Sequence, residues 1–452
     1  MSEPIPDITP AKYGEPPEVD TLETGTETAA GEAGGFSSAA ALGGLKKYTM
    51  VIALVALLVF FHIASGGKMV TSSNMQNLIQ GNAHVLILAM GMLMVIVIGQ
   101  IDLSVGPTAG LVGLITAISA RDLPIPWWVA ALIGLAVGIA VGCWQGFWLA
   151  KMGIPGFITT LAGLLGFRGA IIWISGSVSI PAPTELRSIA SGYLPDWGRS
   201  ALGMNGPTLV LGALGIAAVG YFSLASRQRQ LKLAGSADPL WSVWLRIGLL
   251  SAGIAFASYL FASGREGTSF PIIGIILLVL IFVYHIVTER TPFGRHVYAV
   301  GGNRAAAALT GINVPRTYFF TMLNMSFLAA IAGLLFVGRA TSAAPAMGTG
   351  WELDAIASVF IGGAAVSGGI GTIFGTITGA MVMAVLNSGL MALGVSSDKT
   401  AVIKGLVLLV AVAFDVYNKQ QGRKSIIGHL TKHNQGSENA ATKEVVTEQP
   451  IA

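Results

Sequence analysis

Charged side chains are scarce in this sequence of 452 residues. Asp, Glu, Lys and Arg make up 11% of it, and hydrophobic residues make up 53%. A soluble domain usually carries about twice that charged fraction. The net charge is only +4, and basic residues stand in short segments between apolar runs, as topology signals do. The composition therefore indicates a membrane protein, which we expect to contact membrane lipids and no nucleic acid.

Cysteine is nearly absent as well, since Cys143 stands alone within an apolar run. A single cysteine excludes a disulfide within the chain and argues against a cysteine-based metal site. The sequence also lacks a Gly-x-x-x-x-Gly-Lys-Ser/Thr phosphate loop, and no histidine pair lies on an apolar helix with a glutamate partner. We therefore expect no catalytic residues, no bound cofactor and no metal in this chain.

Apolar runs recur between two polar ends. Residues 1–44 are rich in Pro, Gly, Thr and Glu and predict a disordered acidic tail, and 417–452 form a second polar tail. The segment 45–416 holds roughly twelve runs that suit transmembrane helices, some short enough to be broken or re-entrant. The predicted fold class is therefore an all-α polytopic membrane protein. The predicted runs are 48–65, 83–99, 103–119, 127–150, 157–177, 207–223, 243–263, 271–288, 317–338, 353–367, 371–391 and 401–416.

The basic residues predict the orientation of these runs. Lys46 and Lys47 precede the first run and favour a cytoplasmic N-terminus. Counting spans from there places Lys151, the basic loop 227–232 and the loop 289–317 on the same side. Both termini are then expected in the cytoplasm.

Three interruptions between runs are rich in glycine or proline. They are Gly99–Pro107, Lys151–Gly156 and Val366–Gly371. Non-helical backbone at membrane depth is tolerated only where protein buries it or where it lines a wet cavity. Each interruption therefore indicates either a position near a transport pathway or a tight turn between helices.

Two sets of glycines recur at four-residue spacing. This spacing places each set on one helix face, where the missing side chains let another backbone approach closely. The residues predicted to serve helix packing are Gly134, Gly138, Gly142 and Gly146 in one set, and Gly371, Gly375 and Gly379 in the other.

Two ionisable residues stand within or beside the early apolar runs. Asp102 can accept a hydrogen bond from the backbone at Ser104 and cap the helix that follows; a role of this pair in the pathway or a gate is the alternative. Arg168 lies inside the run 157–177. A guanidinium there needs a partner or water, which suggests a functional role, unless the side chain extends to the membrane interface.

A third candidate, Asp354, follows the sequence Thr349-Gly-Trp-Glu352. This sequence predicts a capping box at a helix start, where both carboxylates suit the positive helix end. Trp351 is expected at the membrane interface. Helix capping is the favoured role of Asp354, and a pathway or gating role is the alternative.

The loop 289–317 carries the most specific local pattern. Asn303 can cap a short helix over 304–310, which Gly311 would end. Such a helix, tied to two spans and presenting small apolar residues, suits docking on another protein; the alternative is a loop helix that lies on the membrane. The residues assigned to docking are Gly301, Gly302, Asn303, Arg304, Leu309 and Gly311.

At this loop the sequence resembles the permease subunits of bacterial ribose/xylose/arabinose-type ABC importers. The stretch from Phe293 to Val314 resembles their coupling loop, and Ile101-Asp-Leu-Ser-Val-Gly106 is similar to their motif after the second span. The stretch 348–397 is similar to their C-terminal third. The resemblance covers nearly all of 48–416. The stretch 207–263 departs from it, because it looks like an inserted helical hairpin that the shorter members lack.

The resemblance implies a permease subunit in the bacterial inner membrane, coupled to ATP hydrolysis by 289–317. The expected partners are a second permease copy in a homodimer, a cytoplasmic ATPase that binds ATP and Mg, and a periplasmic sugar-binding protein. The expected substrate is a monosaccharide; because longer members include D-xylose permeases, the inserted hairpin favours a pentose such as xylose. The alternative is a secondary transporter driven by a proton or sodium gradient, although such proteins usually place ionisable residues near the membrane midplane.

Overall fold

The computed structural model describes residues 38–198, 203–234 and 239–422. The chain divides into two units, 1–47 and 48–452, and only the beginning of the first helix is described in the first unit. Most of the predicted tails, 1–44 and 417–452, lies outside the described residues. The disorder of the first tail therefore stays a prediction.

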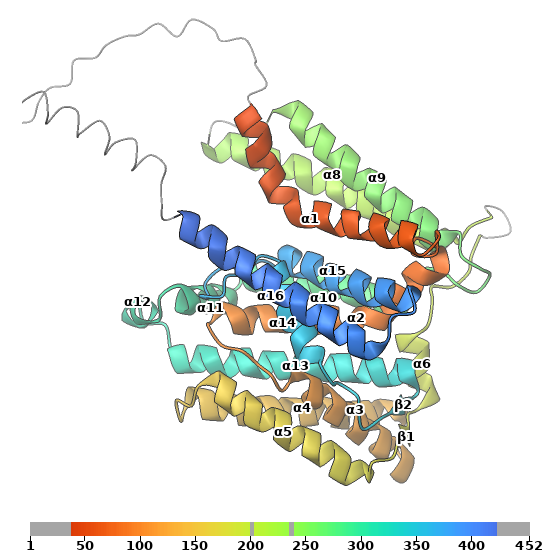
Figure 1. Cartoon of the computed structure of the whole chain (residues 1–452), viewed down its shortest axis with the longest axis vertical. Helices are drawn as coiled ribbons and strands as arrows, with labels where there is room; N and C mark the ends of the chain where they lie inside the picture. Colours follow the sequence, from red (N-terminus) through yellow and green to blue (C-terminus); the bar gives the residue numbers. More distant parts are fainter. Residues whose placement is uncertain (1–37, 199–202, 235–238, 423–452) are drawn as a thin grey trace, which may run out of the picture. The chain divides into compact units, whose positions relative to one another are not determined.

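The described chain consists of helices and two short strands (Figure 1). The strands pair antiparallel, with Ile180 opposite Ala343. In chain order the elements are α1 (Ser38–Ala64), α2 (Ser72–Val97), α3 (Val105–Asp122), α4 (Trp127–Ala150), α5 (Gly156–Ser175), β1 (Ile180–Pro181), α6 (Thr184–Ala190), α8 (Gly206–Ala234), α9 (Leu240–Ala262), α10 (Ile272–Arg290), α11 (Pro292–Gly302), α12 (Arg304–Leu309), α13 (Val314–Ala340), β2 (Ser342–Ala343), α14 (Trp351–Ile361), α15 (Ile373–Ala392) and α16 (Ser397–Gly422).

Eight of the described helices are long and apolar enough to cross a membrane, which confirms the all-α multi-pass architecture. Each of the predicted runs overlaps a helix, but α14 has 11 residues and therefore measures about 16 Å, half of a hydrocarbon core. The number twelve and the cytoplasmic termini stay predictions. The eight helices are α2, α4, α5, α8, α9, α10, α13 and α15.

Helix α2 is the buried centre of the bundle, packed by α10, α13, α14 and α15. It begins at Ser72, after Thr71 accepts a hydrogen bond from the Asn74 backbone, and so the predicted start near 83 is wrong. The extra turns carry polar side chains such as Gln76 and Asn82, which interrupt the apolar run. The fold nevertheless buries them, because neighbouring helices surround α2 there.

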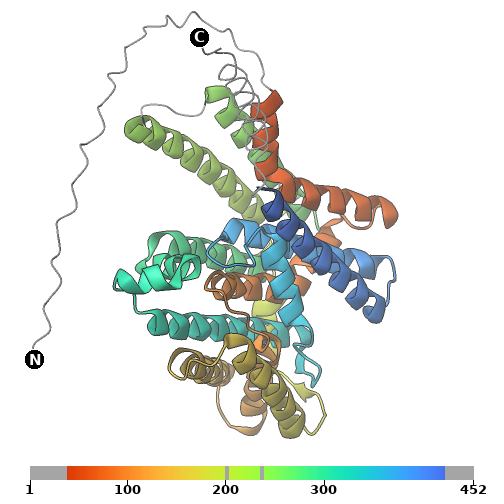
Figure 2. The ribbon, with the colours of Figure 1, turned by 60° about the vertical axis from the view of Figure 1, so that its left-hand side comes forward.

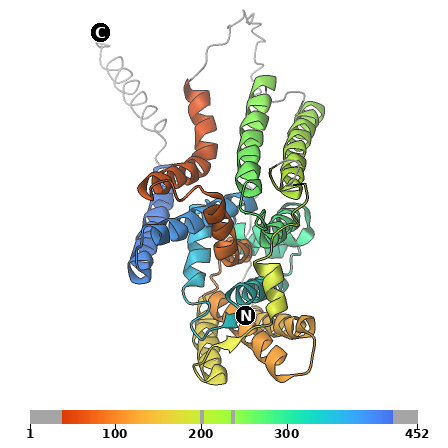
Figure 3. The same ribbon diagram turned by 90° about the vertical axis from the view of Figure 1, so that its right-hand side faces the viewer.

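The two ends of the bundle differ. Helices α11 and α12 lie at one end, and α6 with the two strands lies at the other (Figure 1). Figure 3 looks onto the second end, where β1 and β2 contact α3. Helices α2 and α13 pack along each other and connect the two ends.

The stretch 207–263 forms α8 and α9, which run side by side (Figure 2). Gly212 faces Ser258 and Gly215 faces Ile254, so missing side chains bring the two backbones together. Large apolar side chains such as Trp244 on the outer faces are exposed. In a membrane these faces would meet lipid, which suits a pair of added spans.

Candidate functional site

Two short helices replace the loop between α10 and α13. Thr291 caps α11 by accepting a hydrogen bond from the Gly294 backbone, and Pro292 occupies the first helical position. Asn303 caps α12 by accepting one from Ala306 over 3.0 Å, and Gly311 takes a left-handed φ of +86° beyond its end. The predicted short helix is therefore confirmed, whereas α11 was not predicted.

The segment 301–311, which we call the coupling segment, presents most of its side chains to solvent. The Leu309 side chain is 90% exposed although it is apolar. The Arg304 guanidinium lies 5.4 Å from the Tyr318 ring centre, which steadies it on α13. The side chain of Asn313 caps α13 directly after the segment. The coupling segment is thus a rigid, exposed projection between two capped helices.

The two adjacent glycines of the coupling segment have different surroundings. A Cβ added at Gly301 would overlap the Val97 carbonyl oxygen, whereas a Cβ at Gly302 would meet no atom of a described residue within 4 Å. Gly301 therefore allows α11 to pack on the end of α2. Gly302 is the residue of the pair that remains open to a partner.

Two of the three predicted interruptions, Gly99–Pro107 and Val366–Gly371, meet the start of the coupling segment at one end of the bundle, and the third contacts the first. The Gly369 N–H donates to the Val97 carbonyl over 2.8 Å, and the Gly156 N–H donates to the Gln100 side chain over 2.8 Å. We call the contact of 97–100, 301–302 and 368–371 the backbone junction. Gly156 and Gly368 are buried at these contacts, but most of 151–155 and the side chains of Val366, Ser367 and Ile370 are exposed. Protein therefore covers only part of the non-helical backbone, where membrane depth would require protein or water.

Asp102 and Ser104 form a buried pair beside this junction. The Asp102 carboxylate is 1% exposed, and one oxygen accepts hydrogen bonds from both the backbone N–H and the hydroxyl of Ser104. The Gln145 amide of α4 donates to the same hydroxyl. The other Asp102 oxygen accepts no hydrogen bond from any described residue. The pair therefore fixes the start of α3 and joins it to α4.

Arg168 uses its guanidinium to hold a loop. It donates to the carbonyl oxygens of Pro345 and Met347 over 3.1 and 2.7 Å, and the side chain is half-buried. Glu352 lies near enough to interact with it electrostatically. The partners of this guanidinium inside an apolar run are thus mainly backbone carbonyls. The hydrogen bonds attach the segment before α14 to α5.

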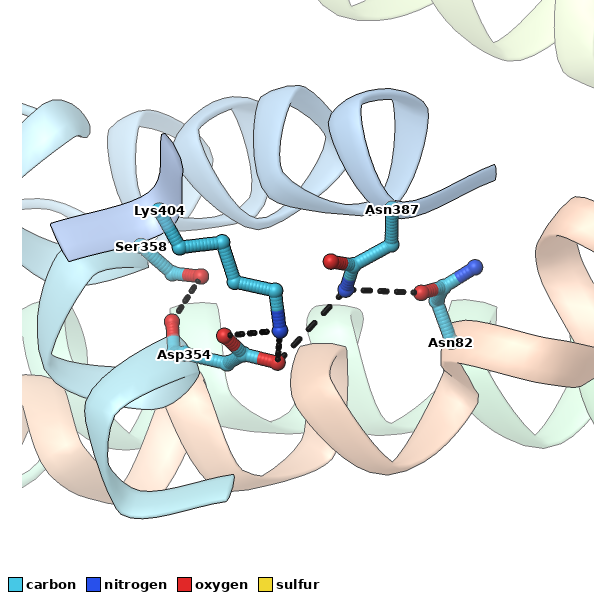
Figure 4. A network of polar contacts seen from close by, with 5 residues as sticks. All are labelled: Asn82, Asp354, Ser358, Asn387 and Lys404. Carbon is cyan, nitrogen blue, oxygen red and sulfur yellow. Dashed lines mark hydrogen bonds and ion pairs between the residues drawn. The ribbon is translucent and has the colours of Figure 1, made fainter. Parts of the chain in front are cut away.

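Asp354 is the centre of a polar network (Figure 4). Its carboxylate, 5% exposed, accepts from Lys404 of α16 over 2.8 and 2.9 Å and from Asn387 of α15 over 3.5 Å. Asn387 donates in turn to Asn82 of α2, which donates to Ser388. The network therefore ties α2, α14, α15 and α16 together. Lys404, Asn387 and Asn82 were not predicted.

The predicted capping box before Asp354 is wrong. Gly350, in a left-handed conformation, is the residue before α14, and it makes no side-chain cap. The Thr349 hydroxyl instead donates to the Ala346 carbonyl over 2.7 Å. Trp351 is buried between His84 and Phe336, with ring centres 4.1 and 4.6 Å away, and is not an interfacial residue.

The first glycine set lines the contact of α4 with α3 and α13. A Cβ at Gly138 would lie 2.5 Å from the Ala330 side chain, and one at Gly142 would lie 2.8 Å from the Leu323 Cα. Gly146 faces Phe319 and Gly134 faces Thr116 in the same way. The second set differs, because Gly371 precedes α15 and the prediction of one shared helix face is wrong for it. Gly375 and Gly379 do face the backbone of α14.

Replacing Gly138 with leucine should therefore reduce the folded yield strongly. Overpacking typically costs about 1–3 kcal/mol even when the neighbours can shift, and here backbone leaves little room. The measurement is the monodisperse fraction in size-exclusion chromatography. Gly220→Leu is the control, because a Cβ added there would have no neighbour within 4 Å in the part of the chain that the structure describes. Equal yields for the two variants would contradict the close packing of α4.

A polar cavity of about 790 Å³ lies at the end opposite the coupling segment. Arg187 and Arg339 contribute guanidinium groups to it, and Gln80 contributes an amide from the early part of α2. Since Val97 ends α2 at the junction, the rise of a helix places the cavity about 25 Å from the junction. Sequence patterns gave no signal for it, because its lining comes from α2, α6 and α13.

The site residues thus fall into separate places. The six residues predicted for docking lie in one projecting segment, although Gly301 packs on the end of α2, and Asp102 is hydrogen-bonded to Ser104. No hydrogen bond shown for the described residues links this pair to Arg168 or Asp354, so the four pathway candidates do not form one site.

Comparisons with known proteins agree with this architecture. A family described as "Branched-chain amino acid transport system / permease component" matches residues 74–412. The match identifies the chain as a membrane permease of a transport system. No solved structure matches the chain.

Comparison with curated relatives shows which kind of permease the chain resembles. The chain is 36% identical over 382 residues to the xylose transport system permease protein of Haemophilus influenzae, covering 83% of this chain and 98% of the relative. It is 35% identical to the xylose transport system permease protein of Escherichia coli K12, with 86% and 96% covered. It is 32% identical to the ribose import permease protein of the same strain, with 81% and 93% covered. The chain therefore belongs to the ribose/xylose-type ABC permeases.

Proposed function

We propose that this chain is the membrane subunit of an ATP-driven importer that carries a pentose across the bacterial inner membrane. The pentose that we propose as its main substrate is D-xylose. The relatives with the higher identities among those compared are xylose permeases, and the alignments cover 83% and 86% of this chain. Two copies of the chain would assemble with a cytoplasmic ATPase, which binds ATP and Mg, and receive sugar from a periplasmic binding protein.

The observation that carries this proposal is the coupling segment. It is exposed, capped at Asn303 and attached rigidly to α13, as a part that seats in a groove of another protein must be. Its Arg304 and the neighbouring basic residues Arg290 and Arg316 favour the cytoplasmic side. An ATPase bound there would move the segment when it closes on nucleotide.

Charge distribution supports a neutral substrate. The helices place few ionisable groups inside the bundle. Of the two buried carboxylates described above, Asp354 is paired with Lys404, and Asp102 is hydrogen-bonded to Ser104 at the break between α2 and α3. Gradient-driven transporters usually need a free ionisable group near the midplane. We assign Asp102 and Ser104 to a gate, because they fix the break between α2 and α3. Arg168 and Asp354 would hold the helix ends that frame the pathway.

Uptake by vesicles tests the proposal. Vesicles that contain the chain, its ATPase and its binding protein should accumulate labelled D-xylose when ATP is supplied inside, and a proton or sodium gradient alone should give none. Ribose measured in parallel tests the pentose assignment. Uptake driven by a gradient without the ATPase would show that the chain is a secondary transporter.

A further inference from the structure

The Tyr298 side chain connects α11 to the segment before α15. Its hydroxyl donates to the Gly371 carbonyl oxygen over 2.7 Å. Burial raises the pKa of Tyr298 to about 12, and the negative charge of Glu289 acts in the same direction. The phenol therefore keeps its proton at physiological pH and remains a hydrogen-bond donor.

Backbone contacts at the junction leave little freedom around this hydrogen bond. A Cβ at Gly369 would lie 2.9 Å from the Gly302 Cα, and Gly301 sits directly against the Val97 carbonyl. The atoms nearest to Gly301, Gly368 and Gly369 are backbone atoms, which cannot absorb a displacement by changing a rotamer. A movement of the α11 end must therefore move the 368–371 segment and the end of α2 with it.

Both helix breaks that meet here contain glycines in left-handed conformations. Gly99 has a φ of +75° after α2, and Gly363, Gly368 and Gly369 have φ values of +88°, +80° and +74° between α14 and α15. Glycine adopts such angles without steric cost, so these positions can absorb backbone rotation. The junction thus joins a rigid lever, α11, to two breaks at which helices can change direction.

We propose that Tyr298 is a positioning residue that transmits the displacement of the coupling segment to α15, and from there to α14. This inference rests on the proposed function, because the displacement comes from the bound ATPase. The hydrogen bond to Gly371 holds the α15 start to α11 while the backbone junction moves. Tyr298 itself contacts neither sugar nor nucleotide.

The Tyr298→Phe variant removes only the hydroxyl. In reconstituted vesicles we expect the number of sugars imported per ATP hydrolysed to fall about two- to tenfold, the change in an equilibrium that one neutral hydrogen bond produces. Hydrogen exchange at the amides around 371–376 should become faster. The thermal stability of the complex and the amount of ATPase that co-purifies should stay near those of the unmodified chain.

Tyr284→Phe is the matched control. Tyr284 donates to the Asn324 side chain over 2.5 Å, which joins α10 to α13 and includes no residue of the junction. An import-per-ATP ratio in Tyr298→Phe equal to that of the control would overturn the inference, and so would a loss that only tracks lost folded complex. If the unmodified complex itself shows no ATP-driven uptake, the proposed function fails instead.

Discussion

Replacing Lys404 with methionine should destabilise the chain by about 3–5 kcal/mol, the cost of removing one partner of a buried ion pair. The Asp354 carboxylate would remain 5% exposed with only the longer hydrogen bond from Asn387. A charge left without its counter-ion among transmembrane helices is costly, because neither protein nor lipid solvates it. The measurement is the apparent melting temperature in detergent.

A second substitution separates lost charge pairing from lost packing. Asp354→Asn in the Lys404→Met background removes the unpaired charge and should recover most of the stability. Lys399→Met on the same helix is the control, because the Lys399 side chain is exposed. A double variant as unstable as Lys404→Met alone would show that the network stabilises the bundle by shape and not by charge.

Reversing the charge of Arg304 should reduce ATP-driven uptake at least tenfold while the spans stay folded. The side chain is exposed on the coupling segment, so glutamate there removes a contact and adds repulsion or an unpaired charge at the interface with the ATPase. A loss of about 1.4 kcal/mol in binding already corresponds to tenfold. Gly302→Glu should act in the same way, since a Cβ added at Gly302 would meet no atom of a described residue within 4 Å.

Arg229→Glu is the control for this charge reversal. Arg229 is exposed near the end of α8 and carries the same charge, but it lies outside the coupling segment. The measurements are uptake, sugar-stimulated hydrolysis and co-purification of the ATPase. Normal sugar-stimulated hydrolysis in Arg304→Glu would contradict the assignment of the segment to docking.

Local signals in the sequence predicted the features that depend on neighbours in the chain. Asn303 and Gly311 set the ends of α12 by bonds and angles that involve at most a few adjacent residues. The spacing of Gly134 to Gly146 likewise predicts one face of α4. The Thr-Pro pair before α11 carried the same kind of signal, a cap followed by a first-turn proline, and would have predicted that helix.

Features that depend on distant partners could not be predicted in this way. Asp354 and Lys404 stand 50 positions apart, and Asn82 and Ser388 stand 306 apart. Asp354 also fitted a local capping pattern, which hid its real partner. Arg168 donates to backbone carbonyl oxygens. Every residue has such a carbonyl, so the sequence does not indicate which ones bind the guanidinium.

The shortness of α14 has a physical consequence for the membrane around it. Its 11 residues rise about 16 Å, and the non-helical stretch 362–372 continues toward the coupling segment. Peptide groups in that stretch cannot face lipid tails, so they must be satisfied by protein or by water. We therefore expect water to reach the bundle interior beside α14, so that a polar solute would cross the shortest dehydrated distance there.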